Sequence, residues 1–305
     1  MRIFVTGASG FIGSAVVPEL LGAGHEVVGL ARSDASAEAL RSLGADALRG
    51  SLDDLDVLRD GASQADGVIH LAFNHDFTQF AAAAQTDLRA IESIGRALEG
   101  TGKPLVIASG LVGLAPGQVV TEDHPFPSGP NSPMGPRALG ALSALGLAER
   151  GVRSSVVRLA MSVHDDIKRG FVGTLIDIAR QKGVAGYVGD GSNRWPAAHR
   201  LDAARLFRLV LESAPASSIW HGVGDEGVPL KEIAEVIGRH LNVPVASIPA
   251  EDVATHFGWL GRLVGVDAPA SSAHTQERLG WTPTHRSLIA DLEQGRFFNE
   301  PEGKN

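Results

Sequence analysis

Three glycines spaced three residues apart follow the first apolar run of the chain and limit how its beginning can fold. Residues 2–5 are an apolar run with β-branched members, and a helical pattern begins at Phe11, so we expect strand, turn and helix. Gly7 suits a sharp turn, Gly10 lets the backbone approach a ligand, and Gly13 lets the helix pack on the strand. The N–H groups at the start of such a helix attract anions. The pattern predicts a turn that binds the diphosphate of a dinucleotide.

We assign this whole turn to the cofactor, through the following residues: Gly7, Ser9, Gly10, Phe11, Ile12 and Gly13. Glycines at this spacing carry little information alone, but they indicate a dinucleotide site when they lie between a strand and a helix.

The composition is that of an ordinary globular chain with a sizeable core, with 305 residues, 44% of them hydrophobic and 20% charged. The formal charge is −8 and the arginines are scattered, which argues against a nucleic-acid partner. No apolar run is long enough to span a membrane, and the first residues already form a strand. We therefore expect no signal peptide, no membrane partner and a cytoplasmic location.

The residue types also exclude several kinds of site. The chain has no cysteine, which excludes disulfides and thiolate metal sites. Its 11 histidines show no ligand spacing, and the sequence contains no zinc-protease, P-loop or serine-hydrolase string. We predict no bound metal.

Apolar runs alternate with helical patterns over the first 160 residues. We expect strands at 2–5, 25–30, 45–48, 67–72, 104–109 and 154–160, and helices at 11–21, 35–43, 53–59, 80–98 and 138–150. Apolar strands that alternate with helices form parallel sheets covered on both faces. The fold class is α/β, a Rossmann-type doubly wound parallel sheet.

The alternation ends after residue 164. Glycines, prolines and tryptophans cluster at 183–196, and a helix begins near Asp202, which could cap it. Further on we expect short strands at 218–221 and 244–248 and helices at 229–241 and 287–294. The sequence thus predicts a dinucleotide-binding domain at 1–163 with 200–222, and a smaller, mostly helical substrate lobe at 164–199 with 223–305.

The end of the second strand predicts which dinucleotide binds. An acidic residue there would bind the adenosine ribose and reject a 2′-phosphate, but this position is Ala31. Arg32 and Ser33 follow it, and both can bind a phosphate. Asp34 lies too late for a good ribose contact. We predict NADP(H) in preference to NAD(H).

Ligands of such sheets bind at the carboxyl ends of the strands. The residues at or just after the ends of the third, fourth and sixth strands are therefore also expected at the cofactor: Leu52, Asp53, Leu71, Ala72, Phe73 and Ala160.

Taken together, these residues resemble the extended short-chain dehydrogenase/reductase superfamily, in its NAD(P)-dependent epimerase/dehydratase-like branch. The matching segments, in the family's order, are Thr6–Gly13, His70–Ala72, Ile107–Ser109, Thr121–Pro125, Val157-Arg158 with Val163-His164, and Leu279–Pro283. The resemblance implies a Rossmann core, a small C-terminal substrate lobe and a small-molecule substrate. Family members often form homodimers through two helices, here those at 80–98 and 138–150, although the apolar faces of these helices would suit a core equally well.

The family's catalytic pair is absent. Its general acid/base is a tyrosine four residues before a lysine, but the single tyrosine here, Tyr187, is followed at that spacing by Gly191. By helix phase, Arg137 matches the lysine, and Pro133 or Met134 matches the tyrosine. Arg137 could hold ribose hydroxyls, although a guanidinium is a poor proton shuttle.

The catalytic candidates are therefore Ser109 and Arg137. Ser109 matches the family's serine, and its alternative role is to terminate the strand through its hydroxyl. If the register differs by one, Gly110 takes that place. As residues of the substrate pocket we name His75, Met161, His164, Trp195 and His199. Each of these could instead serve packing or a surface loop.

Three functions remain open. The first is an NADPH-dependent oxidoreductase that reduces a hydrophobic carbonyl, imine or activated alkene by a non-standard proton path. An imine would suit the missing tyrosine, because an iminium needs no enzyme acid. The second is a catalytically silent NADP(H)-binding sensor, since the superfamily has such members and they typically lack the pair. The third is a sugar-nucleotide epimerase or dehydratase, which depends most on the absent tyrosine.

Overall fold

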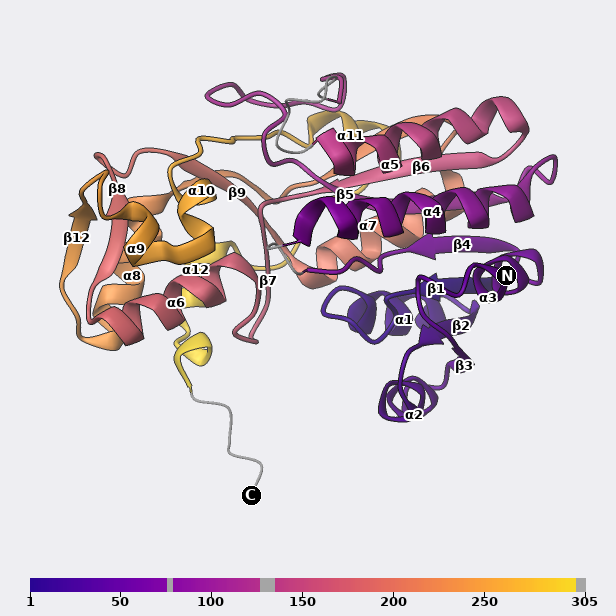
Figure 1. Ribbon diagram of the computed structural model, residues 1–305, viewed down its shortest axis with the longest axis horizontal. Helices are drawn as coiled ribbons and strands as arrows, with labels where there is room; N and C mark the ends of the chain where they lie inside the picture. Colours follow the sequence, from indigo (N-terminus) through magenta and orange to yellow (C-terminus); the bar gives the residue numbers. More distant parts are fainter. Residues whose placement is uncertain (76–78, 127–134, 300–305) are drawn as a thin grey trace.

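Seven parallel strands form the central sheet, in the order β10-β6-β5-β4-β1-β2-β3 (Figure 1). The computed structural model describes residues 1–75, 79–126 and 135–299. The strands are β1 (Arg2–Thr6), β2 (Glu26–Ala31), β3 (Asp46–Arg49), β4 (Gly67–His70), β5 (Pro104–Gly110), β6 (Arg153–Leu159) and β10 (Ser218–Gly222). The strand order reverses between β1 and β4, and ligands of open α/β sheets bind at this position.

Helices cover both faces of this sheet, as the alternating pattern predicted. They are α1 (Gly13–Gly22), α2 (Asp34–Ser42), α3 (Leu55–Ser63), α4 (Phe80–Leu98), α5 (Gly135–Gly146) and α7 (Arg200–Ser213). Helix α1 packs against α7, whereas α4 packs against both α3 and α5. Successive residues of a strand point to opposite faces, so Val5 and Val157 belong to one apolar cluster, and Phe4 and Val156 to the other. The predicted doubly wound sheet is confirmed.

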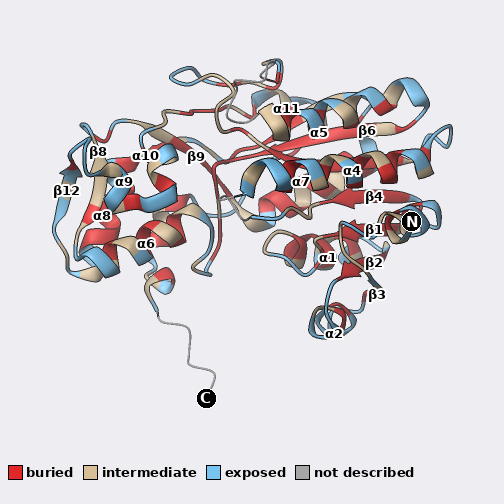
Figure 2. Ribbon diagram, viewed as in Figure 1, coloured by how far each residue is buried: buried red, intermediate tan, exposed pale blue. Residues whose placement is uncertain are grey.

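The smaller lobe has an apolar core of its own, visible in Figure 2 as a second group of buried segments. Its helices are α6 (Gly170–Lys182), α8 (Leu230–Leu241), α9 (Val253–Phe257), α10 (Gly261–Val264) and α12 (Leu288–Glu293). Helix α11 (Ala273–Leu279) packs instead against β10 and α7. Two small sheets complete the smaller lobe: β11 (Asp225–Pro229), β9 (Arg194–His199) and β7 (Ser162–His164), and the pair β12 (Val245–Ile248) and β8 (Ala185–Val188). Short 3-10 turns occur at Leu147–Arg150, Gly258–Leu260 and Arg296–Phe298.

The sequence pattern missed β7, β8, β9, β11 and helix α6. These strands are short and pair with distant segments, and the β9–β11 ladder contains a bulge, so no local period announces them. The expected cap of α7 was also wrong. His199 accepts a hydrogen bond from the N–H of Leu201 and caps the helix, whereas Asp202 is buried inside the first turn. The domain boundaries given above stay a prediction.

None of the helices in the described part of the chain combines the length and the apolar character that a membrane span requires.

Candidate active site

The glycine-rich turn between β1 and α1 has the shape that a diphosphate site requires. Gly7 has φ of +69°, and a Cβ there would lie 2.7 Å from the backbone nitrogen of Ala72. A Cβ on Gly13 would lie 2.1 Å from the carbonyl oxygen of Gly7. Among the described residues, no side chain caps α1 at Ile12, and its first turn has no acidic residue. The positive end of the α1 dipole therefore meets no side-chain acceptor there in the described part of the chain, and the turn fits a dinucleotide diphosphate.

Two arginines lie at the edge of the sheet where the adenosine ribose is expected. Arg32 is exposed directly after β2, and Ser33 caps α2 by accepting a backbone hydrogen bond of 3.1 Å. Arg49, at the end of β3, is in register with Ala31. The Nε atom of Arg49 lies 3.6 Å from the carboxylate of Asp34. The sequence interpretation included Arg32 and missed Arg49, because only strand pairing brings the two together.

The remaining residues predicted at the cofactor follow strands of the central sheet. Leu52 and Asp53 follow β3, Leu71–Phe73 follow β4, and Ala160 follows β6. Asp53 is exposed and forms an ion pair of 3.3 Å with Arg89 of α4. These placements agree with the rule that ligands lie at the carboxyl ends of strands, while the contacts with a cofactor stay a prediction.

A buried chain of polar contacts runs from β1 to α5 beneath this edge. The Oγ1 atom of Thr6 lies 2.8 Å from Nδ1 of His70, and Nε2 of His70 lies 3.1 Å from Oδ1 of Asp87. The other carboxylate oxygen of Asp87 lies 2.7 Å from Nη1 of Arg137. Four elements, β1, β4, α4 and α5, are thus joined by side chains that the apolar core surrounds.

The electrostatics of this chain favour the charged form of Asp87. Burial would raise the pKa of Asp87, but the hydrogen bond with His70 and the positive charge of Arg137 outweigh it, and the pKa is lowered. Burial lowers the pKa of the Arg137 guanidinium, and the carboxylate of Asp87 opposes that change. Asp87 and Arg137 therefore form a charge-balanced buried pair.

Arg137 lies against the candidate pocket, as does Ser109. Its Nη2 atom donates to the carbonyl oxygen of Ala108 at 2.8 Å, and its guanidinium carbon lies 4.0 Å from the centre of the Phe73 ring. A small pocket is lined by Ser109, Gly110, Val112, Leu114, Phe126, Arg137 and Ala138. The two predicted catalytic residues therefore line one pocket, whose other side chains are apolar.

Tyr187 does not reach this pocket. It lies on β8 of the smaller lobe, next to Lys231. Pro133 and Met134, which match the family's tyrosine by helix phase, lie outside the described residues. Among the described residues that line the pocket, Ser109 is the one that carries a hydroxyl group.

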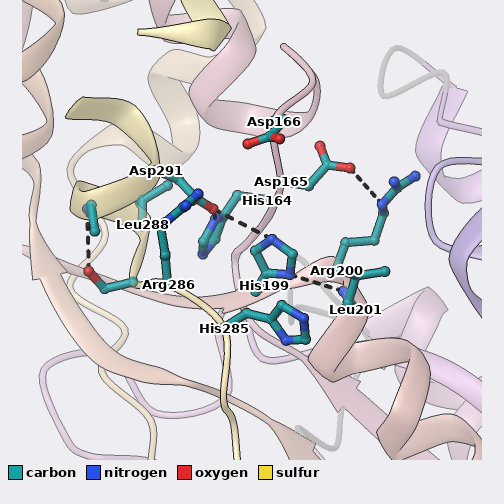
Figure 3. A network of polar contacts seen from close by, with 12 residues as sticks. His164, Asp165, Asp166, His199, Arg200, Leu201, His285, Arg286, Leu288 and Asp291 are labelled. Atoms are coloured by element: carbon teal, nitrogen blue, oxygen red, sulfur yellow. Dashed lines mark hydrogen bonds and ion pairs between the residues drawn. The ribbon is translucent and has the colours of Figure 1, made fainter. Parts of the chain in front are cut away.

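A second polar cluster joins β7, the end of β9 and α12 (Figure 3). The Nδ1 atom of His164 lies 2.8 Å from Oδ2 of Asp291, and Nε2 of His199 lies 3.7 Å from the same oxygen. The rings of His199 and His285 are stacked, with centroids 4.5 Å apart. Because Nδ1 of His199 accepts the backbone N–H that follows it, its proton lies on Nε2, toward Asp291.

Two of the predicted pocket residues thus come together around one carboxylate. His164 is 2% exposed and Asp291 is 1% exposed. Burial would raise the pKa of Asp291, but its hydrogen bond with His164 lowers it. Burial and the charge of His164 lower the pKa of His199. The assignment of these histidines to a substrate pocket stays a prediction.

Arg200 connects this cluster to the glycine-rich turn. Its Nη1 atom donates to the carbonyl oxygen of Phe11 at 3.1 Å and to Oγ of Ser14 at 3.0 Å. Its Nε atom lies 2.6 Å from the carboxylate of Asp165, which follows β7 (Figure 3). The sequence interpretation did not include Arg200, although it lies next to His199.

The other predicted pocket residues have different surroundings. Trp195 is 0% exposed and packs in the core of the smaller lobe, where its ring lies 6.2 Å from that of Phe171. Met161 is buried in the same core. His75 follows β4, with its ring 5.5 Å from that of Phe73, and desolvation and the charge of Arg137 lower its pKa.

Asp87 is the residue that sequence reasoning could have found. It lies on the buried face of α4, among Ala83, Ala84, Ala90 and Ile91. An acidic residue in the apolar stripe of a helix is rarely buried without a partner. That irregularity signals a buried cation nearby, which is Arg137.

Comparison with known proteins supports the assignment of the fold and the family. Residues 3–220 match the model of the NAD dependent epimerase/dehydratase family. An uncharacterized protein of Schizosaccharomyces pombe is 49% identical over 98% of this chain and 100% of its own length. A ketoreductase of Stigmatella aurantiaca is 26% identical over 88% of this chain and 84% of its own length. Its name gives the substrate as a farnesylated 4-hydroxy-2-methyl-3-oxo-dihydroquinoline-1-oxide.

Among solved structures, a dTDP-glucose 4,6-dehydratase of Streptomyces venezuelae with bound NAD superposes with a TM-score of 0.77. It is 20% identical, and the match covers 97% of this chain and 96% of the other. The segment from residue 3 to residue 220 contains the glycine-rich turn, the buried polar chain and the pocket. The chain belongs to the NAD-dependent epimerase/dehydratase family.

Proposed function

We propose that the protein is an NADPH-dependent oxidoreductase that reduces a hydrophobic small molecule without the usual tyrosine. The proposal rests on the pocket at the carboxyl ends of the strands, the same edge of the sheet that carries the glycine-rich turn. In this pocket Ser109 and Arg137 lie among apolar side chains. When bound, NADPH supplies a hydride. The Stigmatella aurantiaca relative, named a ketoreductase, supports a carbonyl group as the acceptor.

The chain's own residues divide the work. The turn at Gly7–Gly13 binds the diphosphate, and Arg32 with Arg49 binds the 2′-phosphate through their forked donors. Arg137, fixed by Asp87 and the Ala108 carbonyl, orders the pocket wall. Ser109 donates a hydrogen bond to the reacting oxygen of the substrate.

The proposal is tested by mixing the protein with NADPH and a panel of aryl ketones, enones and cyclic imines while the absorbance of NADPH is followed. Calorimetry with NADPH and NADH in parallel measures the cofactor preference. Turnover of any member with NADPH supports the proposal. Failure to bind either dinucleotide would refute it.

A second candidate is a sensor that binds NADP(H) without catalysis. The observation in its favour is that the guanidinium of Arg137 is engaged by Asp87, Ala108 and Phe73. An arginine held in this way is poorly suited to take the place of the lysine in the family's catalytic pair. Tight NADPH binding with no turnover across the panel would favour the sensor.

We also propose that the protein forms a homodimer through α4 and α5. Leu139 and Leu142 of α5 are 55% and 45% exposed, and exposed apolar side chains on one helix favour an interface. Light scattering should give the mass of a dimer, and Leu142→Glu should give a monomer. A monomer in the unmodified protein contradicts this part of the proposal.

A further inference from the structure

Arg158 lies beside Ser109 on the face of the sheet that α4 and α5 cover. In the parallel ladders, Ser109 of β5 is in register with Arg158 of β6, and Arg158 is in register with His221 of β10. Residues in register on neighbouring strands point to the same face, with strands about 4.8 Å apart. Three polar side chains from three strands therefore follow one another across the sheet next to the pocket.

The guanidinium of Arg158 is buried without a counter-ion in contact. Arg158 is 0% exposed, and none of its three side-chain nitrogens has a hydrogen-bond partner among the residues the structure describes. Its guanidinium carbon lies 4.0 Å from the centre of the Phe126 ring. Burial lowers the pKa of Arg158 to about 10, so the group stays positively charged at neutral pH.

The groups around Arg158 offset this charge only in part. Glu122 acts on it through its charge, but the two side chains do not form an ion pair. One carboxylate oxygen of Glu122 accepts hydrogen bonds from the N–H and Oγ1 of Thr275, at 2.9 and 2.6 Å, and the other is buried without a hydrogen-bond partner among the described residues. His221 donates from Nδ1 to the carbonyl oxygen of Ser271 at 2.8 Å. Burial lowers the pKa of His221 to about 4, so this ring is neutral and cancels no charge.

The two arginines near the pocket therefore differ in a way that matters for chemistry. Arg137 is paired with Asp87 at 2.7 Å, and the pair carries no net charge. Arg158 has no such partner among the described residues. Because Ser109 is in register with Arg158 on the neighbouring strand, we expect the charge of Arg158 to make the electrostatic potential at Ser109 positive. In a dry site such a potential acts strongly on a reacting atom.

We propose that Arg158 makes the pocket selective for substrates whose reacting atom gains negative charge, such as ketones and enones, and against iminium ions. This inference rests on the proposed reductase function and narrows its substrate class. In the reduction of a ketone, the carbonyl carbon gains a hydride from NADPH, and the π electron pair moves to the oxygen. The oxygen then takes a proton from water, so that the products are the alcohol, NADP⁺ and hydroxide. Arg158 stabilises the charge that develops on the oxygen.

Arg158 acts without touching the substrate. Phe126 lines the pocket and lies over the guanidinium, while Arg158 itself is not among the lining residues. It is therefore a residue that sets the potential of the site. Its removal should change the relative rates of substrates of different charge, which a residue with a purely structural role would not do.

The first test compares two variants, Arg158→Met and Arg158→Lys, with α-tetralone and dihydroisoquinoline as bicyclic ketone and imine. Arg158→Met should lower kcat/KM for the ketone relative to the imine by about tenfold or more, whereas Arg158→Lys should keep the ratio. Circular dichroism and NADPH affinity check that both variants are folded. An unchanged ratio in Arg158→Met overturns the inference.

Glu122→Gln supplies a change in the opposite direction. The glutamine oxygen can still accept the hydrogen bonds of Thr275, while the negative charge that offsets Arg158 is removed. The preference for the ketone should therefore rise by a few-fold. A fall in the preference for the ketone would contradict the proposed effect of the Arg158 charge.

The third measurement does not depend on turnover. Calorimetry of the protein without cofactor should show tighter binding of benzoate than of benzamide, and Arg158→Met should remove the difference. If the unmodified protein shows no preference for benzoate, the inference is wrong. If the preference is present but no dinucleotide binds, the reductase proposal fails while the charge selectivity of the pocket stands.

Discussion

The carboxylate of Asp87 lies 2.7 Å from the guanidinium of Arg137 and ties α4 to α5 next to the candidate pocket. Both side chains are largely withdrawn from solvent, with exposed fractions of 2% and 12%. A buried ion pair contributes modestly to the free energy of unfolding, because the cost of desolvation cancels much of the attraction. The loss of one partner, however, leaves the other charge buried and unpaired. The first prediction follows from this asymmetry.

Asp87→Asn should lower the free energy of unfolding by about 3–5 kcal/mol, because it leaves Arg137 buried without a counter-ion. Urea unfolding measures the change. As a control, Asp53→Asn removes an exposed ion pair with Arg89 and should cost about 1 kcal/mol or less. The double variant Asp87→Asn with Arg137→Met should recover part of the loss. Equal losses of unfolding free energy in Asp87→Asn and Asp53→Asn would contradict the prediction.

The second prediction concerns pH. Burial lowers the pKa of His221 from its ordinary value of 6.5 to about 4, so the unfolded chain binds a proton in this range that the folded chain does not. The stability contributed by neutral His221 is therefore present above about pH 6.5 and is lost as the pH falls toward about 4. Between about pH 7 and about pH 5 this single group should cost about 2 kcal/mol.

The measurement is the unfolding free energy as a function of pH. His221→Asn should flatten the curve over this range, because the amide can still donate to the carbonyl of Ser271 while it does not titrate. His240→Asn, at an exposed histidine, should leave the slope in place. A slope that persists in His221→Asn would assign the pH dependence to other groups.

The third prediction concerns the glycine-rich turn. Gly13→Ala places a Cβ 2.1 Å from the carbonyl oxygen of Gly7, so the turn must move and dinucleotide binding should be lost. Gly22→Ala, at the other end of the same helix, meets no atom within 4 Å. It should retain binding and gain up to about 1 kcal/mol of stability. Calorimetry with NADPH compares the two, and equal affinities would show that the turn does not bind the cofactor.

The fourth prediction concerns the adenosine end of the site. Arg32→Ala should weaken NADPH by about tenfold or more, because a charge-assisted contact with the 2′-phosphate is lost, and should leave NADH nearly unchanged. Arg41→Ala provides a matched control on α2, where this arginine pairs with Glu38. If NADPH and NADH weaken equally in Arg32→Ala, the assignment of the 2′-phosphate to Arg32 is incorrect.

Much of the central sheet could be predicted from the sequence because its signals are local. Helix α4 was predicted with its observed ends, Phe80 and Leu98, since nineteen residues with one apolar face carry a strong period. The smaller lobe was predicted less well. Its strands β7 and β9 are short and pair with each other across more than thirty residues, so their hydrogen bonds depend on contacts that no local window contains.

The site divides in the same way. Gly7 and Gly13 were identified because their requirement is a backbone conformation and a close approach, which the residue type itself reveals. Ser109 was named from its strand, but Arg158 was not placed beside it, because adjacency between β5 and β6 exists only once the strands pair. His164 and Asp291 are separated by 127 positions, and nothing in either local sequence indicates the other.

By itself, then, the sequence determined the alternation of strands and helices in the central sheet, the glycine-rich turn and the family, since backbone preference and hydrophobic period act over a few residues. The tertiary structure decided which charges are paired. It joined Asp87 to Arg137 and left Arg158 buried without a hydrogen-bond partner among the described residues. The energy of a charge depends on the distance and burial of its neighbours, and these exist only in the folded chain.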